Sequence, residues 1–475
     1  MPTTNGTRKI LDLKRWEYCT PPPVVPTSQH LIISAKHVRQ NQVYISSAGI
    51  AHAYSPQEDG WVQLPSPALA TFTQGCCGVG GSFSTGATAG AASLTATGGT
   101  TSTIVTNQTL ARDLRGYSVH ILAGPNAGLT LEILSNTIGA NATITVATQA
   151  SAFSASTVYR LMTPTFFAFG GGTLASGSFK RYDFATNSWV TLANTGLPAT
   201  FGTDAKLVST PSWIDTGYKA FATGTATAGG ASTLTNSAKA WTTNSWTNFQ
   251  IRITAGTGAG QIRTVASNTG TVITTSAAWT TQPDATSQYS IEGNDDFIYL
   301  MGNAAVAMYR YSISGNTWTT LAPGVARAGA PGTALSGTWV HSVLATDWTS
   351  ENAIQNGRYI YSFRGSGASL DRYDIALNAW AALTYAPATE TFGAGTRYAY
   401  CKDAIYVTKE MTGRCFRLDV ARSSMDGWGT LLFPQSGSGQ LETMFDATYR
   451  DGDTEIDYIY LVPNGVQATF RQMVI

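Results

Sequence analysis

SFKRYDFATNSWVTL (residues 178–192) decides the fold, because its pattern recurs along the chain. A Tyr-Asp pair leads through an apolar residue into a polar turn containing Asn, then to Trp, then to an apolar residue three positions later. The relatives are MYRYSISGNTWTTLAP (308–323), LDRYDIALNAWAALTYAP (370–387), AHAYSPQEDGWVQLPSP (51–67) and CFRLDVARSSMDGWGTLLFP (415–434). Such an internal repeat predicts an architecture built from copies of one small unit.

Each repeat indicates four antiparallel strands. A Gly-containing apolar segment before the motif supplies two short strands, and the motif supplies two more around its turn. Four antiparallel strands per repeat are typical of a propeller blade. Strand alternation directs the Tyr into the core between blades, Asp and Asn tighten the turn, and Trp fills the wedge between adjacent blades. A generic β-sandwich with coincidental hairpins is the alternative, which the regular Trp positions disfavour.

The two chain ends complete one another in this pattern. ILDLKRWEYCTPPP (10–23) matches the back half of a unit, and TEIDYIYLVPNGVQATFRQMVI (454–475) matches the front half without its Trp. We therefore predict an all-β, six-bladed β-propeller closed by N- and C-terminal strands, since closure removes free sheet edges. The predicted structural blade tryptophans are Trp16, Trp61, Trp189, Trp318, Trp380 and Trp428.

Two long insertions interrupt the repeats. Trp61 and Trp189 lie almost three times as far apart as Trp16 and Trp61, and so do Trp189 and Trp318. The inserted sequences match one another, as in LRGYSVHILAGPNAGLTLEILSNT (114–137) and WTNFQIRITAGTGAGQIRTVASNT (246–269). Their Thr/Val/Ile alternation predicts two small inserted β modules rather than flexible linkers. The predicted organisation is propeller over 1–83, module A over 84–163, propeller over 164–222, module B over 223–293 and propeller over 294–475.

The Y-D…N-x-W-x-x-L-x-x-P units resemble kelch-type propeller repeats over most of the chain outside the insertions. The Gly-Gly doublet of kelch repeats survives clearly only in AFGGG (168–172). The inserted modules, with their TLTNS and IRITAGTGAGQIR segments, resemble modules found in structural proteins of tailed phages. This second resemblance covers roughly a third of the chain.

The resemblance to phage proteins implies a non-enzymatic virion structural protein, a tail nozzle or hub component that forms a ring around the DNA exit channel. The implied partners are further copies of the chain in a hexamer and other phage tail or head-to-tail connector proteins, with DNA only as passing cargo during ejection. The implied location is the virion, after synthesis in the host cytoplasm. A carbohydrate- or host-receptor-binding attachment propeller is the alternative, and a kelch-type enzyme is a third reading.

Within this hypothesis, aromatic and basic residues of module B are candidates for contacts between subunits. The same residues have a plainer interpretation, in which the aromatic side chains form the module core and the arginines are solvated. The candidates are Trp241, Trp246, Phe249, Arg252 and Arg263.

The sequence predicts no catalytic, cofactor or metal site. Its five histidines lack metal-ligand spacing, its five cysteines lack a Cys-x-x-Cys pair, and no Gly-x-Ser-x-Gly segment is present. Copper-radical oxidases also use kelch-like propellers, and scattered histidines leave that alternative open. Charged residues make up 12% and the formal net charge is +1, so no overall charge draws the chain to nucleic acid. We expect no signal peptide and no membrane insertion, because long apolar runs are missing.

Overall fold

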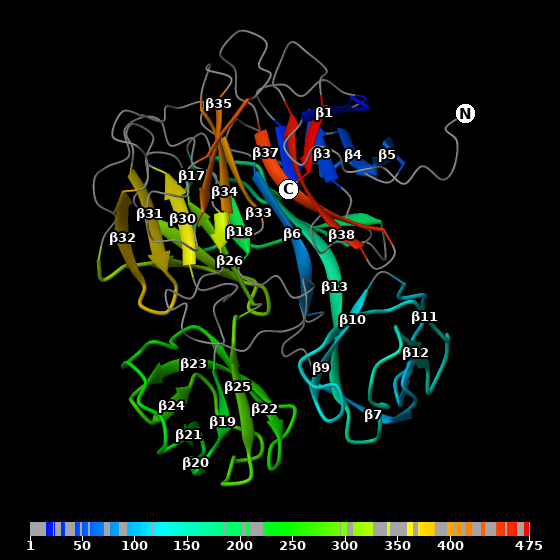
Figure 1. The fold of residues 1–475 in the computed structure, drawn as a ribbon, viewed down its shortest axis with the longest axis vertical. Coiled ribbons are helices and arrows are strands. Elements are labelled where there is room, and N and C mark those ends of the chain that lie inside the picture. The colour runs from blue at the N-terminus through cyan, green and yellow to red at the C-terminus, as the bar shows by residue number, and fades with distance from the viewer. Residues whose placement is uncertain are drawn as a thin grey trace.

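The chain, described here from a computed structural model, is built of short antiparallel strands (Figure 1). Its described residues contain 39 strands and no helix, which confirms the all-β prediction. The structure describes residues 16–21, 23, 30–33, 43–47, 50–55, 58–70, 77–84, 93–115, 117–183, 187–201, 206–209, 222–294, 296–301, 307–325, 340–342, 359–363, 369–384, 397–401, 404–409, 414–419, 429–432, 443–451, 454–462 and 470–474.

Most strands outside the insertions belong to four-stranded antiparallel sheets. In three of these sheets the four strands pair in the order in which they occur along the chain, as in a β-meander. The sheets are β2 (His30–Ile33), β3 (Val43–Ser47), β4 (Ile50–Ser55) and β5 (Gly60–Leu64); β29 (Val340–Ser342), β30 (Tyr359–Phe363), β31 (Ser369–Asp374) and β32 (Ala379–Thr384); and β33 (Arg397–Cys401), β34 (Ala404–Lys409), β35 (Arg414–Asp419) and β36 (Gly429–Leu432).

Two further sheets are each split by an inserted module, and another joins the two chain ends. The strand β1 (Trp16–Cys19) pairs with β39 (Phe470–Val474), which continues to β38 (Thr454–Val462) and β37 (Thr443–Asp451). The split sheets are β6 (Cys77–Ser84), β13 (Val158–Phe169), β15 (Phe179–Asp183) and β16 (Ser188–Thr191), and β18 (Lys206–Ser209), β26 (Phe297–Met301), β27 (Met308–Ser312) and β28 (Thr317–Leu321). Two short strands, β14 (Gly172–Thr173) and β17 (Thr200–Phe201), pair separately.

The repeated motif forms the last two strands of its sheet, and its Tyr lies directly opposite its Trp. The two rings pack against each other at nearly constant distance, which explains why the spacing between them is fixed. The register partners are Tyr54 and Trp61, Tyr182 and Trp189, Tyr311 and Trp318, and Tyr373 and Trp380, with ring centroids 5.0, 5.2, 5.0 and 5.2 Å apart.

The turn between those strands requires a left-handed residue. Asn316 has a φ of 48°, and its side-chain oxygen accepts a hydrogen bond of 2.7 Å from the Tyr311 hydroxyl. Asn and Asp adopt this backbone region more readily than other residues with a side chain. The same bond from a Tyr hydroxyl to the left-handed residue five positions later joins Tyr54 to Asp59, Tyr182 to Asn187 and Tyr373 to Asn378.

Large apolar side chains fill the space between successive sheets. One cluster joins Phe167, Phe169 and Phe179 of the β6–β16 sheet to Ile298, Leu300 and Tyr311 of the β18–β28 sheet. A second cluster joins the opposite face of β26 and β27 to Ile360, Tyr373 and Trp380 of the β29–β32 sheet. Because both faces of these strands are buried, the sheets stack face to face.

Each insertion forms a curled β unit (Figure 1). Module A contains β7 (Leu94–Gly99), β8 (Thr103–Thr106), β9 (Ser118–Ala123), β10 (Thr130–Glu132), β11 (Ser135–Asn136), β12 (Thr143–Thr145) and the first part of β13. Module B contains β19 (Ala222–Thr225), β20 (Ala228–Gly230), β21 (Thr233–Thr235), β22 (Gln250–Ala255), β23 (Ile262–Asn268), β24 (Val272–Thr275) and β25 (Gln288–Glu292).

The two modules share internal hydrogen bonds as well as sequence. The Asn136 side chain accepts a bond from the Leu114 N–H and donates to the Arg112 and Thr137 carbonyls. The matching residue of module B is Asn268. Its side chain accepts a bond from the Trp246 N–H and donates to the Thr242 and Thr269 carbonyls. Equivalent amides with equivalent hydrogen bonds indicate one fold used twice.

Candidate functional site at the contact between the two modules

The two modules pack against each other through equivalent strands, β9 of module A and β22 of module B. In the internal match, Ser118 corresponds to Gln250 and His120 corresponds to Arg252. The modules lie side by side in Figure 1, on the same side of the four-stranded sheets. A direct bond joins them, since Arg252 Nη1 donates to the carbonyl oxygen of Leu122. We call this surface the inter-module contact.

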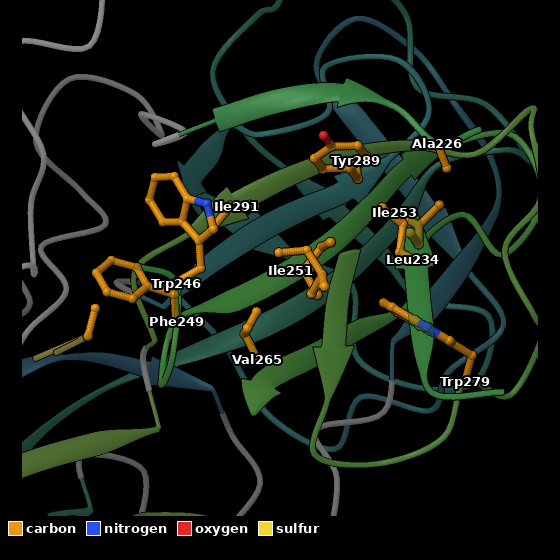
Figure 2. Packing of buried hydrophobic residues seen from close by; sticks show 12 residues of the cluster. Ala226, Leu234, Trp246, Phe249, Ile251, Ile253, Val265, Trp279, Tyr289 and Ile291 are labelled. Atoms are coloured by element: carbon orange, nitrogen blue, oxygen red, sulfur yellow. The ribbon is translucent and has the colours of Figure 1, made fainter. Parts of the chain in front are cut away.

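Strand alternation separates an apolar face from a polar face in each module. In module B, Ile251, Ile253 and Ile291 point into the module core, which Figure 2 shows with Trp246, Phe249 and Tyr289 around them. The intervening residues of β22 and β25 therefore point to the opposite face. These are Gln250, Arg252, Ser290 and Glu292, and all four side chains are buried. A polar face that is also buried must have its charges matched locally.

Arg252 and Glu292 form a buried ion pair at the centre of this face. Arg252 Nη2 lies 2.7 Å from Glu292 Oε1, and Arg252 Nε lies 3.0 Å from the same oxygen and 3.2 Å from Oε2. The two residues are 2% and 0% exposed. Burial, with the positive charge of Arg160 as a smaller cause, lowers the pKa of Arg252 to about 9. The guanidinium therefore remains charged at neutral pH, and its remaining donor reaches into module A.

His120 occupies the matching place on the module A side. It is 1% exposed, and its Nδ1 lies 2.8 Å from the Thr130 hydroxyl. Its cross-strand partner Arg160 is also buried. Burial first, then the charges of Arg160 and Arg252, hold the pKa of His120 well below 6.5, so the imidazole is neutral at pH 7.

A glycine turn completes the inter-module contact. Gly260 follows β22, has a φ of +87°, and is buried. A side chain at this position would overlap the Val158 side chain of module A. The AGTGAG segment (255–260) thus serves both a left-handed turn and a close approach between modules, for which glycine is uniquely suited.

Module B is also attached to the neighbouring four-stranded sheets. Arg310 of β27 donates to Asn248 Oδ1 at 2.5 Å, and the Asn248 amide donates to the Ile375 carbonyl at 3.2 Å. Ala376, in the turn after β31, is buried in the module B core. Module A is attached differently, because β13 runs without a break from the module into a four-stranded sheet.

The structure places the five candidate contact residues of module B in different settings. Trp246 and Phe249 lie in the module core, Trp241 packs partly buried against it, and Arg252 lies in the inter-module contact. Arg263 lies 5.5 Å from the Trp279 ring centre and donates to the Ala278 carbonyl. Contacts between subunits through these residues stay a prediction. The role of Arg252 between modules of one chain has no signal in the sequence, because a polar strand face normally indicates solvent.

The motif tryptophans occupy the final strands of their sheets. Trp318 and Trp380 are buried, and Trp61 and Trp189 are partly buried. Trp16 lies on β1, and Trp428 falls outside the described residues.

No group of three or more His, Cys, Asp or Glu side chains within the described ranges is arranged to hold a metal ion. A helix with the length and hydropathy needed to cross a membrane is likewise not found among those residues.

Comparison with known proteins assigns no family. No protein-family model matches the chain, and no curated protein matches it. Among solved structures, a streptogramin B lyase structure matches 96% of this chain and 96% of that chain, with 6% identity and a TM-score of 0.36. A likeness at this level transfers no activity to the present chain.

Two predictions are corrected at this point. The prediction of a virion structural protein in a tail nozzle or hub is contradicted by the comparison with solved structures, in which the structure named is that of a lyase. The prediction that the chain is not an enzyme is contradicted by the same comparison, and a TM-score of 0.36 assigns no activity to this chain. The domain boundaries, self-association and virion location stay predictions.

Proposed function

We propose that the chain self-associates, as a closed propeller that carries its two modules as one rigid arm and contacts a second copy of itself through that arm. The six four-stranded groups of strands are the blades of one ring in this proposal. The pairing of β1 with β39, from Trp16 opposite Met473 to Cys19 opposite Phe470, supports closure by the two chain ends. Such closure leaves no free edge in the ring.

The rigidity of the arm is supported by three independent attachments. Module A continues through β13 into a four-stranded sheet, and module B is attached to the sheets by the Asn248 hydrogen bond and by the packing of Ala376 in its core. The bond from Arg252 to the Leu122 carbonyl then joins the two modules to each other. Module A, module B and the four-stranded sheets are thus each attached to the other two. Movement of either module alone would break some of these contacts.

The single observation that carries the proposal is the packing of one module on another of the same fold. One module already binds another module of the same fold within the chain. A second exposed apolar surface on a module would allow the same kind of contact between two chains. Module A has such a surface, because Leu134 and Ile138 are 49% and 67% exposed. The formal net charge of +1 favours a protein partner over a polyanion.

Native mass spectrometry of the full chain tests the proposal. At micromolar concentration we expect masses of two or more times the 50.2 kDa of one chain. The double variant Leu134→Ser/Ile138→Ser is expected to return the protein to the single-chain mass. The matched control is Val325→Ser, an equally exposed apolar residue outside the modules, which is expected to preserve the assembly. A single-chain mass for the natural protein, or an assembly that survives the double variant, would overturn the proposal.

A further inference from the structure

Two guanidinium groups on neighbouring strands act on His120. Arg160 faces it from β13, and Arg252 faces it from β22 of the other module. Glu292 on β25 reaches this group through its ion pair with Arg252. The Thr130 hydroxyl and the Leu129 backbone also contact the imidazole. Any added positive charge at His120 would therefore meet two guanidinium groups in a region closed to water.

We propose that the inter-module contact is an acid-sensitive latch, in which neutral His120 allows the two modules to pack and protonated His120 drives them apart. The inference concerns contacts inside one chain and goes beyond self-assembly, so it does not depend on the proposed partner.

Electrostatics and desolvation act in the same direction on this residue. An imidazolium buried beside two guanidinium groups is destabilised by like-charge repulsion, which is strong at low effective dielectric constant. It also loses its hydration, which is costly for any buried charge. When the modules separate, water reaches the ring and both effects disappear. Separation is therefore coupled to the uptake of a proton.

The sign of the pH dependence follows from the two pKa values. Packing holds the pKa of His120 well below 6.5, by burial first and then by Arg160 and Arg252, whereas a solvated imidazole has a pKa near 6.5. The modules are thus held at full strength above pH 6.5. Below that value, the equilibrium constant for separation rises about tenfold per pH unit until the pKa of the packed state is reached.

Only one of the two modules has the titrating group. The position that corresponds to His120 in module B is Arg252, which keeps its charge over the whole physiological range. The positions that correspond to Arg160 and Met162 are Ser290 and Glu292. The duplicated faces have therefore diverged so that one presents a fixed ion pair and the other a residue whose charge changes with pH.

Oxidation of Met162 in the full chain measures the separation. Met162 is fully buried and lies on the same strand face as Arg160. Dilute hydrogen peroxide converts an accessible methionine to its sulfoxide, which peptide mass spectrometry locates. Met308, which is buried in the core between two sheets, serves as the internal reference. Between pH 6.5 and pH 5 we expect the rate at Met162 to rise about tenfold per pH unit while the rate at Met308 remains constant.

Two substitutions decide whether His120 is the cause. His120→Gln retains a hydrogen-bonding side chain without the titration, and it is expected to make Met162 oxidation independent of pH over this range. His52→Gln removes another buried histidine, on β4 and away from the modules, and is expected to behave like the natural protein. If the glutamine variant does not fold, His120→Met supplies the same comparison with an apolar side chain. Protection of Met162 in the natural protein at pH 5, or equal acid opening in a variant that lacks His120, would overturn the latch.

Discussion

The indole Nε1 of Trp318 donates a hydrogen bond of 3.1 Å to the carbonyl oxygen of Ala193, which lies four residues after Trp189. The same relationship joins Trp189 to Pro65, four residues after Trp61, and Trp61 to Thr20, four residues after Trp16. Each of these three motif tryptophans is thus bonded to the segment that follows the preceding motif Trp. The recurring spacing in the sequence sets a contact between neighbouring repeats, as well as the turn inside each one.

Trp318→Phe tests this contact. Phenylalanine retains most of the apolar volume but leaves the partly buried Ala193 carbonyl without this donor, and the loss of such a hydrogen bond costs about 0.5–1.5 kcal/mol. We expect the free energy of unfolding, measured by urea denaturation, to fall by that amount. Val325→Ala, at an exposed apolar residue nearby, is expected to change it by less than about 0.5 kcal/mol. Equal effects of the two substitutions would contradict a role for the indole bond.

The left-handed turn residue gives a second prediction. Asn316→Ala removes the acceptor of the Tyr311 hydroxyl and forces alanine into a φ of 48°, whereas Asn316→Gly removes the same acceptor without backbone strain. We expect the alanine variant to be about 1 kcal/mol less stable than the glycine variant, because a left-handed alanine costs that much. Thermal unfolding of the two variants side by side measures the difference. A glycine variant no more stable than the alanine variant would show that strain at this position is unimportant.

Much of the fold follows from local pattern, and the candidate site does not. The all-β class could be predicted from the Tyr-Asn-Trp spacing, because each of those residues has its partner within the same hairpin, as with Tyr311, Asn316 and Trp318. The inter-module contact joins residues about 130 positions apart, Leu122 and Arg252. Alternation along β22 correctly indicates a polar face, but alternation cannot distinguish a face open to water from one covered by a second module.

The buried ion pair yields a third prediction. Arg252→Met or Glu292→Met alone leaves the other member of the pair buried without its ion-pair partner, and such a loss costs about 3–5 kcal/mol. Replacing both, as Arg252→Met/Glu292→Met, removes both desolvation costs and is expected to be less destabilising than the sum of the single changes. A double-mutant cycle on unfolding free energies measures the coupling. Additive effects would show that the two groups act independently.

Gly260→Ala tests the close approach between the modules. The new methyl group would overlap the Val158 side chain, and the left-handed backbone at a φ of +87° would be strained. Gly139→Ala is the matched control, because it has a φ of +120° in module A with no atom near the added group. The backbone strain is common to both variants, so the difference between them reports the clash. We expect the Gly260 variant to be about 1–3 kcal/mol less stable than the Gly139 variant, as at other overpacked sites. Peroxide oxidation of Met162 at pH 7 should rise in the Gly260 variant and remain unchanged in the control, since only the former separates module A from module B. Equal stability and equal oxidation in the two variants would mean that the turn can move away from Val158 without cost.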